Sequence, residues 1–254
     1  MASSRFVVLV PLYIYPLEGA WEPLLRSAQA HPDIRFLAVI NPSNGPGDTP
    51  LPDASYQAAL WQLSAIPNIE PIGYVHCTYS QRDAEVVQRD IDLYVGWNSD
   101  GALRMDGIFI DEAPSQPDHL PYMTALAEYA NRTWEANLGR QAITVYNPGV
   151  VPNPAYYDAA TYVVSFEQSE EHWNLDSVKQ TLASLSPAHC SKSIAIVHSC
   201  TGQSDSPDDG VRDLVRQIKS MGFAGLYATH QMGGGFTNWP QSWNRLLEAA
   251  VEEA

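Results

Sequence analysis

Three acidic side chains stand directly after short apolar runs, in positions from which carboxyl groups can do chemistry. Asp111 and Glu112 follow the apolar residues 108–110, and a proline soon afterwards stops the run from continuing. Glu167 ends a second strand-like run, residues 162–166. Two carboxyl groups across a cleft can cleave a glycosidic bond, because one protonates the leaving oxygen and the other acts as nucleophile or as base for water.

An isolated Asp-Glu pair also has a simpler interpretation. Asp111 can cap a following helix, and Glu112 can be an ordinary solvated acid on the surface. Taken alone, the pair favours this interpretation, because helix caps and exposed acids are common and catalytic acids are rare. The elements that carry the acids must decide between the two.

Strand-like and helix-like segments alternate along the chain. Apolar, β-branched runs of strand length predict eight strands, and apolar residues at helical spacing predict a helix after each of them. The expected strands are 6–10, 35–40, 71–77, the run within 106–114, 142–146, 162–167, 193–198 and 225–229, and the expected helices are 21–30, 56–66, 84–97, 121–138, 154–160, 175–185, 211–221 and 243–254.

This order predicts the fold class. Helical crossovers join parallel neighbours, so eight strand-then-helix units without a linker indicate one parallel sheet. Eight units close most naturally into a single (β/α)8 TIM barrel, which we expect to form one domain over residues 1–254. An open doubly wound sheet is the alternative, but it usually has a glycine-rich loop after its first strand, and residues 11–15 contain no glycine.

In a barrel, the loops that follow the strands share one face, where active sites are built. Strands four and six alternate around the barrel, so Asp111 or Glu112 can face Glu167 across a cleft. Consecutive strand residues point to opposite sides, so only one of Asp111 and Glu112 aims into the cleft unless the chain turns there. Other polar or aromatic residues near strand ends are candidates for sugar contacts, namely Tyr13, Asn41, Tyr74, Asn147, His198 and Trp239.

Two rival chemistries fit the sequence less well. The histidines at strand ends are isolated, without the i, i+4 or His-x-His spacing of common metal sites, so we expect no metal and no cofactor. No Gly-x-Ser-x-Gly motif for nucleophilic serine chemistry occurs, and Cys77 has no activating helix start. Cys190 and Cys200 flank a strand, too far apart to join, so we expect free thiols.

The balance of charge narrows the class of ligand. Acidic residues outnumber basic ones 29 to 14 among 254 residues, which gives a formal net charge of −15. This charge argues against nucleic acid or an anionic membrane as a partner, and fits a neutral or cationic ligand. No apolar run has the length of a membrane-spanning helix. We expect a polysaccharide substrate and a monomeric protein.

Several motifs in the first half of the chain, together with a looser match in the second half, resemble the spherulin-4-like proteins, classed as glycoside hydrolase family 135. The most specific are the blocks Asn-Pro-Ser-Asn-Gly-Pro-Gly and Asp-Gly-Ile-Phe-Ile-Asp-Glu. The resemblance rests on Val10–Pro16, Asn41–Gly47, Gly73–Val75 with Tyr79 and Arg82, Asp90–Ile91 with Tyr94 and Trp97, Asp106–Glu112, and Ser165–Glu167.

The resemblance implies a (β/α)8 barrel and, as in the characterised fungal members, endo-acting hydrolysis of α-1,4-linked N-acetylgalactosamine in galactosaminogalactan. The acidic site of the family maps onto Asp111, Glu112 and Glu167. The family also implies a secreted or cell-wall-associated protein, although the first residues show no signal-peptide core, which leaves a cytoplasmic location open. The alternative function is a carbohydrate-binding or spore-coat-type structural protein that keeps the barrel without turnover.

Overall fold

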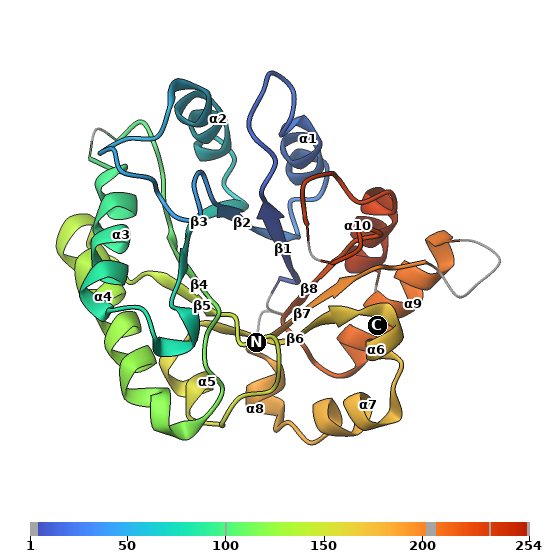
Figure 1. Cartoon of the computed structure of the whole chain (residues 1–254). Helices are drawn as coiled ribbons and strands as arrows, with labels where there is room; N and C mark the ends of the chain where they lie inside the picture. The colour runs from blue at the N-terminus through green and yellow to red at the C-terminus, as the bar shows by residue number, and fades with distance from the viewer. Residues whose placement is uncertain (1–4, 100, 202–206, 234, 253–254) are drawn as a thin grey trace.

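Eight parallel strands close into a barrel in chain order, and β1 pairs with both β2 and β8 (Figure 1). The computed structural model describes residues 5–99, 101–201, 207–233 and 235–252. The expected (β/α)8 barrel is confirmed. The strands are β1 (Val7–Leu12), β2 (Arg35–Ile40), β3 (Ile69–His76), β4 (Gly107–Asp111), β5 (Ile143–Tyr146), β6 (Tyr162–Ser169), β7 (Ser193–His198) and β8 (Gly225–Ala228).

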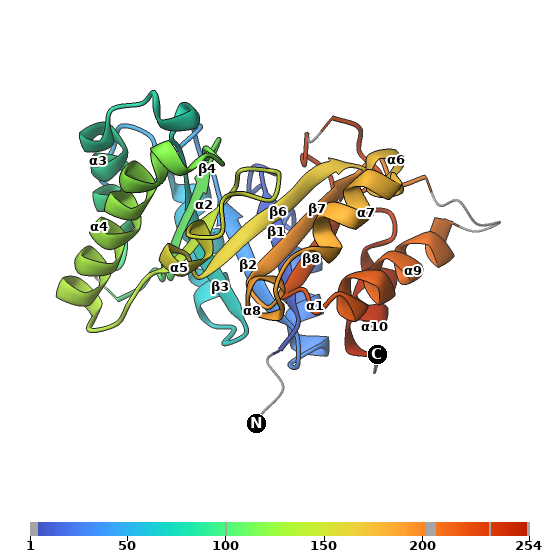
Figure 2. The same cartoon turned by 90° about the horizontal axis from the view of Figure 1, so that it is seen from below.

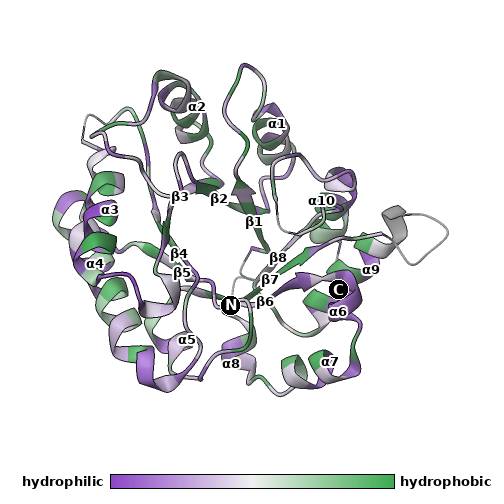
Figure 3. Cartoon of the chain, in the orientation of Figure 1, coloured by the Kyte–Doolittle hydropathy of each residue, from purple (hydrophilic) through white to green (hydrophobic). Residues whose placement is uncertain are grey.

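Helices surround the strands, and the larger ones carry both hydrophobic and hydrophilic residues, as expected where one face packs on the barrel (Figure 3). Within the described part of the chain, none of them combines the length and the apolar character needed to cross a membrane. The helices are α1 (Glu22–Ala30), α2 (Ala54–Ser64), α3 (Ala84–Gly96), α4 (Leu120–Leu138), α5 (Tyr156–Ala159), α6 (Glu170–Trp173), α7 (Asp176–Ala183), α8 (Pro187–Cys190), α9 (Pro207–Ser220) and α10 (Trp243–Val251).

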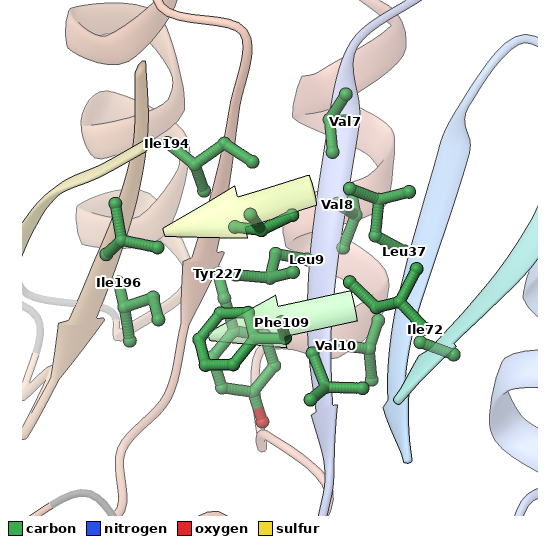
Figure 4. Close-up of a cluster of buried hydrophobic side chains, with 14 of the residues drawn as sticks. Val7, Val8, Leu9, Val10, Leu37, Ile72, Phe109, Ile194, Ile196 and Tyr227 are labelled. Carbon is green, nitrogen blue, oxygen red and sulfur yellow. The ribbon is translucent and has the colours of Figure 1, made fainter. Parts of the chain in front are cut away.

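The strands are nearly continuous runs of buried apolar residues, because helices cover the outside of the barrel and side chains fill its inside. Burying one large apolar side chain stabilises the fold by about 1.5–3 kcal/mol. The resulting core is a rigid base for the loops at the carboxyl ends of the strands. Figure 4 shows part of it, including Val7–Val10 of β1, Leu37, Ile72, Phe109, Ile194, Ile196 and Tyr227.

One close approach between a helix and a strand sets the direction of a side chain in the site. A Cβ atom on Gly73 would lie 2.4 Å from the ring of Tyr94 in α3, so only glycine fits there. The hydroxyl of Tyr94 donates to the carbonyl of Ile40 at 2.9 Å, which docks α3 on β2 as well. Since Gly73 faces the helix, its neighbour Tyr74 faces the barrel interior.

The observed boundary of β6 corrects one expectation about the site. Sequence patterning ends this strand at Glu167, but the strand continues to Ser169, which pairs with His198 of β7. The register shifts between Val164 and Phe166, and the pairing with β7 then continues beyond Glu167. Glu167 therefore lies inside a paired strand and has a fixed backbone. Figure 2 shows β6 and β7 side by side, with α6 at the end of β6.

Candidate active site

Asp111 and Glu167 are brought together by a shared hydrogen-bond donor. The side-chain nitrogen of Asn147 donates to Oδ1 of Asp111 at 2.7 Å and to Oε2 of Glu167 at 2.6 Å. Because both bonds start at the same nitrogen, these two carboxyl oxygens lie at most about 5.3 Å apart. Asp111 and Glu167, on alternate strands of the barrel, thus form one bridged pair, as the barrel topology predicts.

The amide of Asn147 is held in a single orientation. The backbone N–H of Gly149 donates to Oδ1 of Asn147 at 3.1 Å, so the side-chain NH2 group must face the acids. The N–H of Glu167 donates to the carbonyl of Gly149 at 2.9 Å, and the N–H of Asn147 to that of Ile110 at the same distance. These bonds tie the turn after β5 to both neighbouring strands.

The other oxygen of Asp111 accepts a hydrogen bond from the hydroxyl of Tyr74 at 2.8 Å. Tyr74 stacks on Phe109 and meets the edge of Tyr13, and burial raises the pKa of both tyrosines well above the usual value. Their hydroxyls therefore stay protonated and can donate. Tyr13, Tyr74, Phe109, Tyr227 and Phe236 form a continuous set of ring contacts, here called the aromatic floor.

The two bridged acids differ in proton affinity. Burial raises the pKa of Glu167 to about 7, and the nearby Asp111 carboxylate adds to the rise, while the bond from Asn147 opposes it. Burial also raises the pKa of Asp111, but hydrogen bonds from Tyr74, from the backbone of Glu112 and from Asn147 oppose this rise. Near neutral pH, the pair can hold a proton on Glu167 and a negative charge on Asp111.

Glu112 leaves the strand in another direction because the chain turns there. Its φ angle is 51°, in the left-handed region that residues with a side chain rarely adopt. Its side chain is 42% exposed, and Oε2 lies 3.6 Å from Nδ1 of His76. Of the two adjacent acids, Asp111 belongs to the bridged pair and Glu112 lies beside His76. Neither caps a helix, since α4 begins after His119.

Three of the predicted sugar-binding residues, Tyr13, Tyr74 and Asn147, join the acids or the aromatic floor. The other three make contacts elsewhere. Asn41 accepts from the N–H of Gly45 within its own loop, His198 bonds Ser199, and the indole N–H of Trp239 donates to the carbonyl of Ala20.

The sequence predicts Asn147 as a sugar contact but does not predict its place between the acids. The topology contained the signal, because strand five lies between strands four and six and the residue that follows it must stand between their ends. Among the residues in the described ranges, no three His, Cys, Asp or Glu side chains are grouped as metal ligands. Cys77, Cys190 and Cys200 are free thiols.

Comparison with known proteins places the chain in a family. The model of spherulation-specific family 4 matches residues 7–250. The chain belongs to this family. It is 28% identical to spherulin-4 of Physarum polycephalum over 260 residues, which cover 100% of this chain and 70% of that protein.

Solved structures agree with the family assignment. The crystal structure of Aspergillus clavatus Sph3 in complex with GalNAc superposes with a TM-score of 0.89 at 31% identity, covering 99% of this chain and 100% of that one. A chitinase from Bacteroides thetaiotaomicron shares the fold alone. Its TM-score is 0.59 at 10% identity, and the match covers 98% of this chain and 96% of that one. This spherulation-specific family member therefore shares its whole barrel with Sph3.

Proposed function

We propose that this protein is an endo-acting glycoside hydrolase that cleaves an amino-sugar polysaccharide, with α-1,4-linked N-acetylgalactosamine in galactosaminogalactan as its substrate. The observation that carries the proposal is the pair Asp111 and Glu167, bridged by Asn147. The likeness to Sph3, whose crystal structure contains GalNAc, supports the sugar. The excess of acidic residues supports a polymer with some free amino groups.

In the proposed reaction, Glu167 protonates the glycosidic oxygen as the bond to the anomeric carbon breaks. A pKa of about 7 supplies that proton near neutral pH. Asp111 attacks the anomeric carbon from the other side, forming a glycosyl-enzyme. Glu167 then takes a proton from a water molecule while the water oxygen bonds to the anomeric carbon. The bond from that carbon to Asp111 breaks, which releases the sugar, restores the Asp111 carboxylate and leaves Glu167 protonated.

The separation of the acids supports this double displacement. Carboxyl groups about 5–5.5 Å apart suit a covalent intermediate and retention of configuration, whereas inversion needs roughly 6.5–9.5 Å. The nearest oxygens of Asp111 and Glu167 lie at most about 5.3 Å apart, which favours the shorter separation. Glu112 then supports the reaction by binding a sugar hydroxyl beside the pair.

Digestion of purified galactosaminogalactan tests the proposal. We expect the wild-type protein to release oligosaccharides of mixed length, identified by mass spectrometry, with the α configuration retained in NMR spectra. Asp111→Asn and Glu167→Gln should abolish release without unfolding the protein. Full activity in both variants would overturn the assignment of the pair.

The same assay distinguishes the hydrolase from the alternative function. A carbohydrate-binding or structural protein on this barrel would retain the polymer on a column and release no reducing ends. As the family implies, we also propose a secreted or cell-wall-associated monomer. Fractionation of the source cells and sedimentation velocity test these two statements.

A further inference from the structure

A rare backbone conformation follows β3, next to the proposed catalytic pair. Thr78, Tyr79 and Ser80 have φ angles of 47°, 52° and 69°, all in the left-handed region. Residues other than glycine enter this region singly, and a β-branched residue such as threonine is a strong outlier there. Three in succession persist only where surrounding contacts impose them, and such strain gathers at functional sites.

Contacts from β4 and α3 hold this left-handed turn. The N–H of Tyr79 donates to the carbonyl of Glu112 at 2.7 Å, and the N–H of Cys77 to that of Asp111 at 3.0 Å. Arg82 bonds the carbonyl of His76 at 3.0 Å and forms an ion pair with Asp90. The turn is thereby fixed to the backbone of Asp111 and Glu112.

The contacts hold the backbone of Tyr79 and leave its ring exposed. The residue is 58% exposed, and among the described residues its hydroxyl forms no hydrogen bond and its ring forms no aromatic pair. Tyr15 is also exposed, but its hydroxyl bonds Asp53 and its ring meets Tyr56. Trp61 is 62% exposed on helix α2 and follows no strand end.

We propose that Tyr79 is a stacking platform for a sugar unit that flanks the cleaved bond, an inference that rests on the proposed function. An aromatic ring presents a flat apolar face to the C–H face of a sugar. It also attracts a protonated amino group, as in a deacetylated unit of the polymer. An endo-acting enzyme must hold units beyond the cleaved bond, and the backbone bond from Tyr79 to Glu112 places this exposed residue next to the acids.

Binding measured apart from cleavage tests this platform. In the Glu167→Gln background, calorimetry with galactosaminogalactan oligosaccharides should show Kd about fivefold higher for Tyr79→Ala, and within twofold of the parent for Tyr79→Phe. Trp61→Ala, the matched control, should leave Kd unchanged. In the active protein, Tyr79→Ala should raise KM by the same factor with little change in kcat.

The outcomes separate the two proposals. If Tyr79→Ala bound like the parent, or if Tyr79→Phe lost as much affinity as Tyr79→Ala, the platform would be wrong while the hydrolase stood. If the wild-type protein bound the oligosaccharides without cleaving them, the proposed hydrolase activity would be wrong. The Kd values of the Tyr79 variants would still test the platform. A wild-type protein that bound no amino-sugar oligosaccharide would overturn both.

Discussion

Strand β4 has an aspartate at each end, and their surroundings are opposite. Asp106, just before the strand, accepts bonds from Arg104 at 2.9 Å and Arg140 at 2.7 Å. Asp111, its last residue, accepts only from neutral groups of Tyr74 and Asn147 among the described side chains. Burial raises the pKa of both, but two guanidinium groups oppose the rise only at Asp106.

The difference matches the roles of the two ends of a barrel, since the amino ends of the strands contribute to stability and the carboxyl ends carry the active site. At the amino ends of the strands, buried charge is neutralised, as the ion pair of Arg35 with Glu70 also illustrates. At the carboxyl ends, acids are buried without cations, which costs stability but leaves a proton available on Glu167. The two ends should therefore respond in opposite ways to the same substitution.

The same change at both ends of β4 gives the largest expected contrast. Asp111→Asn should lower kcat about 10³-fold because the attacking carboxylate is lost, with little change in stability. Asp106→Asn should leave kcat near the wild-type value and lower the free energy of unfolding by about 2 kcal/mol, since two arginines lose a partner. Steady-state kinetics and urea unfolding measure the two effects. Equal effects on activity would contradict the contrast.

Two asparagines allow a second comparison. Asn147→Leu removes the donor shared by Asp111 and Glu167, and we expect kcat to fall about 10²-fold as the pair loses its geometry. Asn68→Leu removes bonds to three backbone carbonyls away from the acids, so it should lower stability by about 1–3 kcal/mol and spare kcat. An Asn147→Leu variant with wild-type kcat would show that the bridge has no catalytic role.

Glu167→Gln should stabilise the protein while inactivating it. The pKa of Glu167 is about 7 in the folded protein against an ordinary value of 4.5, so the folded state binds the proton more tightly. Wild-type stability therefore falls as pH rises from about 4.5 to 7, by about 2–3 kcal/mol. The variant lacks this loss, so its advantage in thermal unfolding should appear at pH 8 and vanish at pH 4. A variant less stable at pH 8 would contradict the burial argument.

The pH profile of kcat gives the most gradual expected change. Because Glu167 must be protonated to donate, kcat should fall about tenfold per unit as pH rises above about 7. Initial rates on the polymer between pH 5 and 9 check this slope. A flat profile over the alkaline half would assign the proton to another group.

Much of the architecture was predictable because it depends on local pattern. Arg35–Ile40 and Ser193–His198 form strands with the predicted bounds, since continuous apolar runs suit strands buried on both faces. Asp111 and Glu167 could be placed opposite each other because chain order in a closed barrel sets which strand ends are neighbours. The end of β6 was missed, because its last residues are held by pairing with β7 rather than by their own pattern.

By itself, the sequence determined the barrel, the end of it that carries acids, and the family to which the chain belongs. Only the tertiary structure decided that Asp111 joins Glu167 through Asn147, that Glu112 turns toward His76, and that Thr78–Ser80 are left-handed. The physical reason is one of range. Strand patterns follow from neighbouring residues, whereas proton affinity and strained backbone depend on groups that are distant in sequence and adjacent only after folding.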